Sequence, residues 1–138
     1  MQKRKRFVEF EEDNGTVLRY FHHENGGGLV ASSADVDATA WVDGSAYVEA
    51  GAVVRPRVRV LTGAWVDHDA VVREGALIGS AAHVGPRAVI GRGAQLGPRV
   101  KVGPDAHVGS GVRLGPDAVV PAGSRIPSHG TRTRSTAA

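Results

Sequence analysis

Residues 84–97 read Val-Gly-Pro-Arg-Ala-Val-Ile-Gly-Arg-Gly-Ala-Gln-Leu-Gly, and this stretch carries a pattern that repeats every six residues. Followed in both directions, one register of the repeat contains only Val, Ile or Leu from Val30 to Ile126. The register two positions before it contains only Ala or Val from Ala34 to Ala118. Because nothing interrupts the phase, the repeat decides the architecture of most of the chain.

A period of six residues fits neither an α-helix nor a coiled coil, but it fits a short strand followed by a corner. In Ala106-His107-Val108, the alternation of a strand places Ala106 and Val108 inside and His107 outside. Gly, Pro, Ser and Asp supply turn chemistry in the residues between strands. We expect the glycines that open the corners from Gly79 to Gly115 to adopt backbone angles that a Cβ would penalise.

This pattern resembles the hexapeptide repeat of left-handed parallel β-helices, in which three hexapeptides form one triangular coil. The resemblance covers roughly residues 28–126. It implies an all-β fold, a left-handed parallel β-helix of about five to six triangular coils, and the left hand comes from the resemblance alone. The residues expected in the core include Val36, Val54, Val72, Ile90 and Val108.

A β-hairpin is predicted before the repeat, because Asn14-Gly15 separates two β-rich runs. An isolated hairpin is marginally stable in water, so we expect it to pack on the helix end, on a neighbouring subunit or on a partner. The three glycines at 26–28 predict a flexible joint between the hairpin and the first coil. The predicted division is a basic tail at 1–6, the hairpin at 7–25, the hexapeptide-repeat β-helix at 26–126 and a polar, disordered tail at 127–138.

The composition narrows the class of protein. The chain has 138 residues and no Cys, which excludes disulfides, thiolate metal sites and a Cys nucleophile. It contains no apolar run of the ~20 residues that cross a membrane. We therefore expect a soluble protein that is cytoplasmic or part of an assembled particle. The sequence pI is about 9.8, but the basic terminal segments lack interleaved aromatic residues, so nucleic-acid binding is disfavoured.

Outward-facing residues 18 positions apart should stack in ladders at roughly 4.8 Å spacing. Two of these ladders are apolar in their early coils, and a contiguous apolar strip of this kind usually marks an interface. The resemblance implies side-by-side packing of three helices, so we expect a homotrimer. The alternative is that the hairpin folds back over the strip. The strip consists of Tyr47, Val53, Trp65, Val71 and Val89.

The resemblance makes the histidines candidate metal ligands, because γ-class carbonic anhydrases of the same superfamily hold a metal with three His at a subunit interface. Their pattern includes two His five residues apart, and this chain has no such pair. In a trimer, His107 of one subunit could approach His83 of another, with His68 at the corner that joins their faces. These three would be the ligands of a metal; the simpler interpretation is that each is an ordinary exposed residue.

The resemblance also includes acyltransferases, which need a His as general base and a groove for an acyl-carrying cofactor. Members with this activity usually have a loop bulging from the coils, whereas the unbroken phase of this chain leaves no room for one. If the chain is an enzyme, His83 or His107 is the expected base, and Lys101 or Arg113 would contact phosphate.

Taken together, the sequence favours a non-catalytic structural or assembly protein of the kind found in phage and bacterial assemblies. A rigid homotrimeric β-helix would dock onto protein partners through its N-terminal hairpin or its open C-terminal coil. No cofactor, metal or membrane contact is expected. The alternative is an enzyme with its site at the trimer interface, a hexapeptide acyltransferase ahead of a γ-carbonic-anhydrase-like metalloenzyme.

Overall fold

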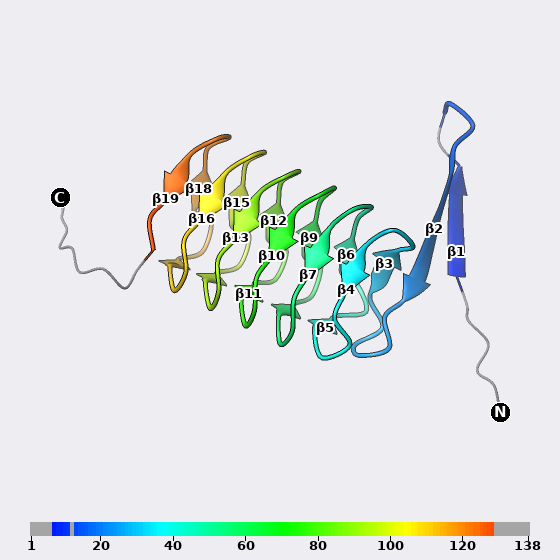
Figure 1. Cartoon of the computed structure of the whole chain (residues 1–138), viewed down its shortest axis with the longest axis horizontal. Helices are drawn as coiled ribbons and strands as arrows, with labels where there is room; N and C mark the ends of the chain where they lie inside the picture. The colour runs from blue at the N-terminus through cyan, green and yellow to red at the C-terminus, as the bar shows by residue number, and fades with distance from the viewer. Residues whose placement is uncertain (1–6, 12, 129–138) are drawn as a thin grey trace.

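The computed structural model describes residues 7–11 and 13–128. The predicted basic tail at 1–6 and all but the first two residues of the predicted tail at 127–138 lie outside these residues. The described chain is made of strands and turns (Figure 1). No helix in this part of the chain is long and apolar enough to cross a membrane.

Each hexapeptide from residue 29 onward contributes one short strand, because Ala and the aliphatic residue of the repeat both point inward and leave one outward residue between them. These strands are β3 (Leu29–Ala31), β4 (Asp35–Val36), β5 (Trp41–Val42), β6 (Tyr47–Val48), β7 (Val53–Val54), β8 (Arg59–Val60), β9 (Trp65–Val66), β10 (Val71–Val72), β11 (Leu77–Ile78), β12 (His83–Val84), β13 (Val89–Ile90), β14 (Gln95–Leu96), β15 (Lys101–Val102), β16 (His107–Val108), β17 (Arg113–Leu114), β18 (Val119–Val120) and β19 (Arg125–Ile126).

The strands form three parallel faces along one axis (Figure 1). The first sheet contains β3-β6-β9-β12-β15-β18, the second β4-β7-β10-β13-β16-β19 and the third β5-β8-β11-β14-β17. Val71 pairs with Val53 on one side and Val89 on the other, so neighbouring strands are three hexapeptides apart. The predicted all-β parallel β-helix with an N-terminal hairpin is confirmed, and its left hand remains an implication of the resemblance.

The core is a column of small and aliphatic side chains inside the three sheets. Val54, Val72, Ile90 and Val108 are at most 2% exposed, and an Ala or Val of the second register packs between successive aliphatic layers. Val36 lies in the first coil and is only partly buried against this cluster. The burial of these apolar side chains is the main source of stability of the fold.

At the corners, the positive φ angle occurs at a different residue from the predicted glycine. Every sixth residue from Gly51 to Gly123 has a φ between 58° and 76°, whether or not it is a glycine. This residue comes two positions after the one that opens the corner. The corner-opening glycines have ordinary φ values, and a Cβ added at Gly85 would lie 2.6 Å from the carbonyl oxygen of Val102 in the next coil. The prediction of unusual φ at these glycines is therefore wrong: from Gly79 to Gly109 the close approach between coils requires them, whereas Gly115 has open space.

The hairpin consists of β1 (Phe7–Glu11) and β2 (Val17–His22), and it extends the first sheet. β2 pairs antiparallel with β3, so the hairpin covers the edge that the first coil would otherwise expose. The predicted flexible joint at 26–28 is wrong. The amide of Gly28 donates to the carbonyl of Val42, and a Cβ at Gly26 or Gly28 would collide with Val42, so this segment is packed against β5.

Candidate functional site

Two carboxylates are buried on the corner between the first and second sheets. Glu49 is 9% and Asp67 is 8% exposed, and they are the buried charged residues in the part of the chain that the structure describes. They hold equivalent positions in successive coils, and the next position in this column is Gly85. A buried carboxylate is costly unless it is hydrogen-bonded, so the contacts of these two acids identify what this corner is built to hold.

Asp67 binds two imidazole rings, one with each oxygen. Its Oδ1 lies 2.7 Å from Nδ1 of His68 and accepts the backbone N–H of His68 at 2.7 Å. Its Oδ2 lies 3.0 Å from Nε2 of His83, which comes from β12 in the next coil. The corner turn and the stacking of coils therefore bring three titratable residues together without an inserted loop.

The contacts of this cluster favour the charged forms of Asp67 and His68. Burial alone would raise the pKa of Asp67, but hydrogen bonds from the ring and backbone of His68 and from the ring of His83 outweigh it, so the pKa is lowered. The hydrogen bond to Asp67 raises the pKa of His68, against a smaller opposing effect of burial. Asp67 therefore stays ionised to a lower pH than an isolated Asp, and His68 keeps its proton to a higher pH than an isolated His.

Glu49 connects the hairpin to this cluster. Its Oε1 accepts the hydroxyl of Tyr20 at 2.5 Å, and its Oε2 accepts the indole N–H of Trp65 at 2.8 Å. Trp65 in turn stacks on His83, with ring centroids 4.2 Å apart. A continuous set of contacts thus runs from Tyr20 on β2 to the imidazole of His83.

Sequence reasoning missed Tyr20, Glu49 and Asp67 as members of a site. The available signal was the column of residues that open this corner, in which two acids precede a run of glycines. Which neighbours those acids contact depends on the coil geometry.

The three histidines considered as metal ligands are not brought together within one chain. His68 and His83 share Asp67, whereas His107 lies on β16 of the second sheet between Val89 and Arg125. No group of three or more suitable side chains that could hold a metal ion occurs among residues 7–11 and 13–128. A site of three His would need a second subunit, and it stays a prediction.

The cations expected beside the histidines are placed differently. Lys101 on β15 is the strand neighbour of His83, as a phosphate contact beside that base would require. The neighbour of His107 is Arg125 rather than Arg113. Arg113 pairs with Gln95 on the third sheet, so it is not adjacent to either histidine within the chain.

The predicted interface strip is found on the outside of the first two sheets. Val53, Val71 and Val89 are half-buried neighbours in the second sheet. Tyr47 and Trp65 are about 40% exposed, and they line a shallow groove of about 370 Å³ together with Ser45, Glu49 and Gly63. Tyr47 also packs edge-on against Tyr20, with ring centroids 6.3 Å apart, so the hairpin reaches the start of the strip.

Comparison with known proteins supports the resemblance to the hexapeptide-repeat proteins over part of the chain. The family model for bacterial transferase hexapeptides (six repeats) matches residues 93–128. No curated protein matches.

The chain is similar to three solved structures of transferases. One is a perosamine N-acetyltransferase from Caulobacter crescentus, with 25% identity over 67% of this chain and 49% of that chain and a TM-score of 0.37. Another is the acetyltransferase domain of PglB from Neisseria gonorrhoeae, with 28% identity over 72% and 53% and a TM-score of 0.31. The third is a hexapeptide transferase family protein from Anaplasma phagocytophilum, with 17% identity over 78% of both chains and a TM-score of 0.48. The chain spans about half the length of the first two proteins.

These findings contradict the prediction of a non-catalytic structural or assembly protein. The family model that matches residues 93–128 describes bacterial transferases. The findings favour the alternative, a hexapeptide acyltransferase. The prediction gave weight to the lack of room for an inserted loop, whereas Asp67, His68 and His83 come together at a corner of the repeat without such a loop.

Proposed function

We propose that this protein is a hexapeptide acyltransferase, which moves an acyl group from a thioester carrier to a hydroxyl or amine of an acceptor. The observation that carries the proposal is the binding of His83 and His68 by the two oxygens of the buried Asp67. The match of residues 93–128 to the bacterial transferase hexapeptide family supports the same class of reaction.

His83 is the general base in this proposal. When Nε2 of His83 donates its hydrogen to Asp67, the other ring nitrogen, Nδ1, carries the lone pair that accepts a proton. That nitrogen makes no hydrogen bond within the described part of the chain. The face of Trp65 fixes the plane of the ring, and the side chain of His83 remains 31% exposed to a substrate.

The reaction follows from this arrangement. Nδ1 of His83 takes the proton from the acceptor O–H or N–H while the acceptor oxygen or nitrogen attacks the carbonyl carbon of the thioester. The ionised Asp67 stabilises the imidazolium that results. The carbon–sulfur bond then breaks, and the sulfur leaves with the proton that the imidazolium returns. No covalent acyl-enzyme is needed.

A homotrimer is part of the same proposal. The half-buried row of Val53, Val71 and Val89 is apolar and continuous over three coils, and the first sheet presents Tyr47 and Trp65 beside it. A neighbouring subunit packed on this strip would cover the groove beside Trp65 and keep water away from His83.

Thiol release from acetyl-coenzyme A in the presence of a panel of amino sugars, amino acids and sugar alcohols tests the proposal. We expect H83A and D67N to lower the rate by about 10²–10⁴-fold, the usual contribution of a general base. H22A is the matched control and should keep full activity, because His22 lies on strand β2 of the hairpin and its ring contacts the carbonyl of Gly27 rather than Asp67. Full activity of H83A, or no transfer to any acceptor, would overturn the proposal.

A further inference from the structure

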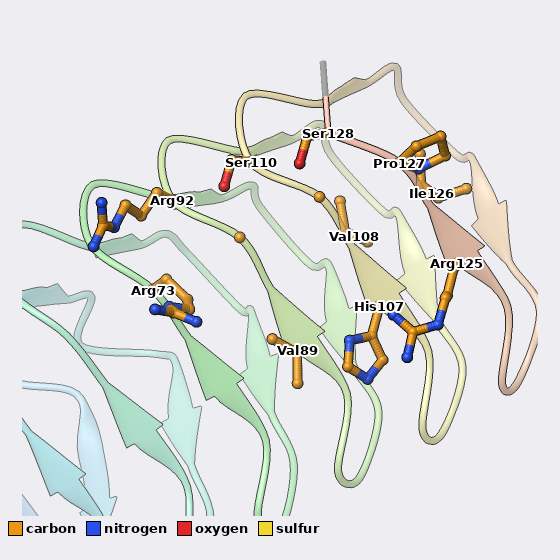
Figure 2. A pocket seen from close by; sticks show the side chains of 12 residues that line it. Arg73, Val89, Arg92, His107, Val108, Ser110, Arg125, Ile126, Pro127 and Ser128 are labelled. Carbon is orange, nitrogen blue, oxygen red and sulfur yellow. The ribbon is translucent and has the colours of Figure 1, made fainter. Parts of the chain in front are cut away.

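A second concave surface lies at the far end of the helix from the hairpin, over the last coils of the second sheet. It is a hollow of about 590 Å³ between the outward face of this sheet and the corner that leads to the third sheet. Figure 2 shows Arg73 and Arg92 on one side of it and His107 and Arg125 on the other. The hydroxyls of Ser110, in the turn after β16, and of Ser128, in the segment after β19, also lie at this surface (Figure 2).

Two of the positive charges of this hollow, those of Arg73 and Arg125, are uncompensated within the described part of the chain. Its lining contains three arginines and no carboxylate. Arg92 has a weak partner outside the lining, with 3.3 Å between its Nε and an oxygen of Glu74. Arg73 and Arg125 are exposed and form no ion pair within the described part of the chain.

Arginines elsewhere on the β-helix have acidic partners one coil away. At the corner between the first and second sheets, Arg87 forms a two-pronged pair with Asp105, with distances of 2.8 and 3.0 Å. At the corner between the third and first sheets, Arg99 pairs in the same way with Asp117, at 2.8 and 3.1 Å. The repeat thus places an acid one coil away where an arginine is to be neutralised, and it does not do so for Arg73 or Arg125.

We propose that this hollow binds a phosphate-bearing group, with a diphosphate as the best match. Guanidinium groups form bidentate hydrogen bonds with phosphate oxygens, and serine hydroxyls can donate to the remaining oxygens. A diphosphate offers enough oxygens to engage arginines from both sides of the hollow. The volume lies within the range of small-molecule sites.

This site is separate from the corner at Asp67, and the proposal stands whether or not the protein transfers acyl groups. Its ligand chemistry has two sources, a nucleotide-based acyl carrier or an acceptor linked to a nucleoside diphosphate. Both present a diphosphate to the same arginines, so binding measurements can tell them apart.

Isothermal titration of the full chain with inorganic pyrophosphate tests the site without requiring activity. We expect the affinity to fall about tenfold in R73Q and in R125Q, because each substitution removes a charge-assisted hydrogen bond. R59Q is the matched control: Arg59 is an exposed arginine of the third sheet that lies outside the lining, and its loss should leave the affinity unchanged. H83A should also bind pyrophosphate as the wild-type protein does.

The source is then assigned by titrating coenzyme A and UDP separately. Tighter binding of one of them, weakened by R73Q and R125Q, supports the site and identifies the source. The proposal is overturned if pyrophosphate does not bind, or if R73Q and R125Q bind it as tightly as R59Q. We expect H83A to lose transferase activity and to keep its affinity for pyrophosphate, because the base and the phosphate site are separate.

Discussion

The indole of Trp65 lies flat against the imidazole of His83, with ring centroids 4.2 Å apart and planes inclined by 13°. The indole is itself fixed, because its N–H donates to the buried Glu49. Glu49 also accepts the hydroxyl of Tyr20 from the hairpin. The orientation of the proposed base therefore depends on an element outside the β-helix.

This dependence predicts the effect of W65F. Phe keeps an aromatic face for His83 but removes the indole donor, so Oε2 of Glu49 loses its partner. We expect the free energy of unfolding to fall by about 1–3 kcal/mol, the cost of an unsatisfied buried acceptor. We expect kcat to fall by about tenfold, because the ring of His83 is held less well. Denaturant unfolding and the thioester assay measure the two effects.

A double-mutant cycle with E49Q is the control for this prediction. If Glu49 acts on His83 through Trp65, the two substitutions should not be additive, and their coupling in unfolding free energy should be about 0.5–3 kcal/mol. Strictly additive effects on both stability and kcat would show that Glu49 does not position Trp65.

The contact between Asp67 and His68 predicts a pH-dependent stability. The hydrogen bond to Asp67 raises the pKa of His68 above its ordinary value of 6.5, so its stabilising contribution is complete below that pH and is lost as the pH rises through the folded-state pKa. The pKa of Asp67 is lowered from 3.8, so its contribution is present above that value and is lost as the pH falls through the folded-state pKa.

D67N should therefore cost most stability between about pH 4 and pH 6.5, and less at higher pH. Urea unfolding of both proteins across this range measures the difference. Titration of the His68 ring by NMR is the direct check, and its pKa should fall in D67N. An unchanged His68 pKa would mean that the carboxylate does not hold the ring in solution.

The fold could be predicted in detail because the six-residue register determines, for each residue, whether its side chain points into the core or outward. Val72 and Ile90 belong to the core whatever the sheets contact, since one unbroken phase sets the direction of every side chain. The site could not be predicted in the same way. Asp67 meets His83 because positions 16 residues apart face each other across a corner and the next coil, and the periodic pattern does not record that contact. The contact between Tyr20 of the hairpin and Glu49 is still harder to predict, because Tyr20 lies outside the repeat.

The apolar strip predicts how assembly will respond to charge. V71D places a carboxylate in the middle of the row formed by Val53, Val71 and Val89, where a trimer interface would bury it without a partner. We expect the variant to be a folded monomer when the wild-type protein is a trimer. V119D is the control, because Val119 is 67% exposed at the last coil of the first sheet. Light scattering after size exclusion gives both masses, and a trimeric, folded V71D would exclude this strip as the interface.

The corner glycines allow a sharp test of why the repeat uses them. Gly85 and Gly115 both precede a proline, and neither has a positive φ. A Cβ at Gly85 would lie 2.6 Å from the carbonyl oxygen of Val102 and 2.9 Å from the carbonyl carbon of Gly103, whereas a Cβ at Gly115 meets nothing within 4 Å. G85A should therefore lower the free energy of unfolding by about 1–3 kcal/mol through overpacking between coils.

G115A should be neutral or stabilising by about 0.4–1 kcal/mol, because alanine restricts the unfolded chain at a site where its Cβ fits. Thermal and denaturant unfolding of the two variants shows whether glycine is needed at these corners because the coils approach closely or because the backbone adopts an unusual angle. Equal destabilisation by both substitutions would mean that these positions need glycine for its backbone freedom, as the sequence first indicated. Destabilisation by G85A alone would establish that contact between successive coils selects the residue.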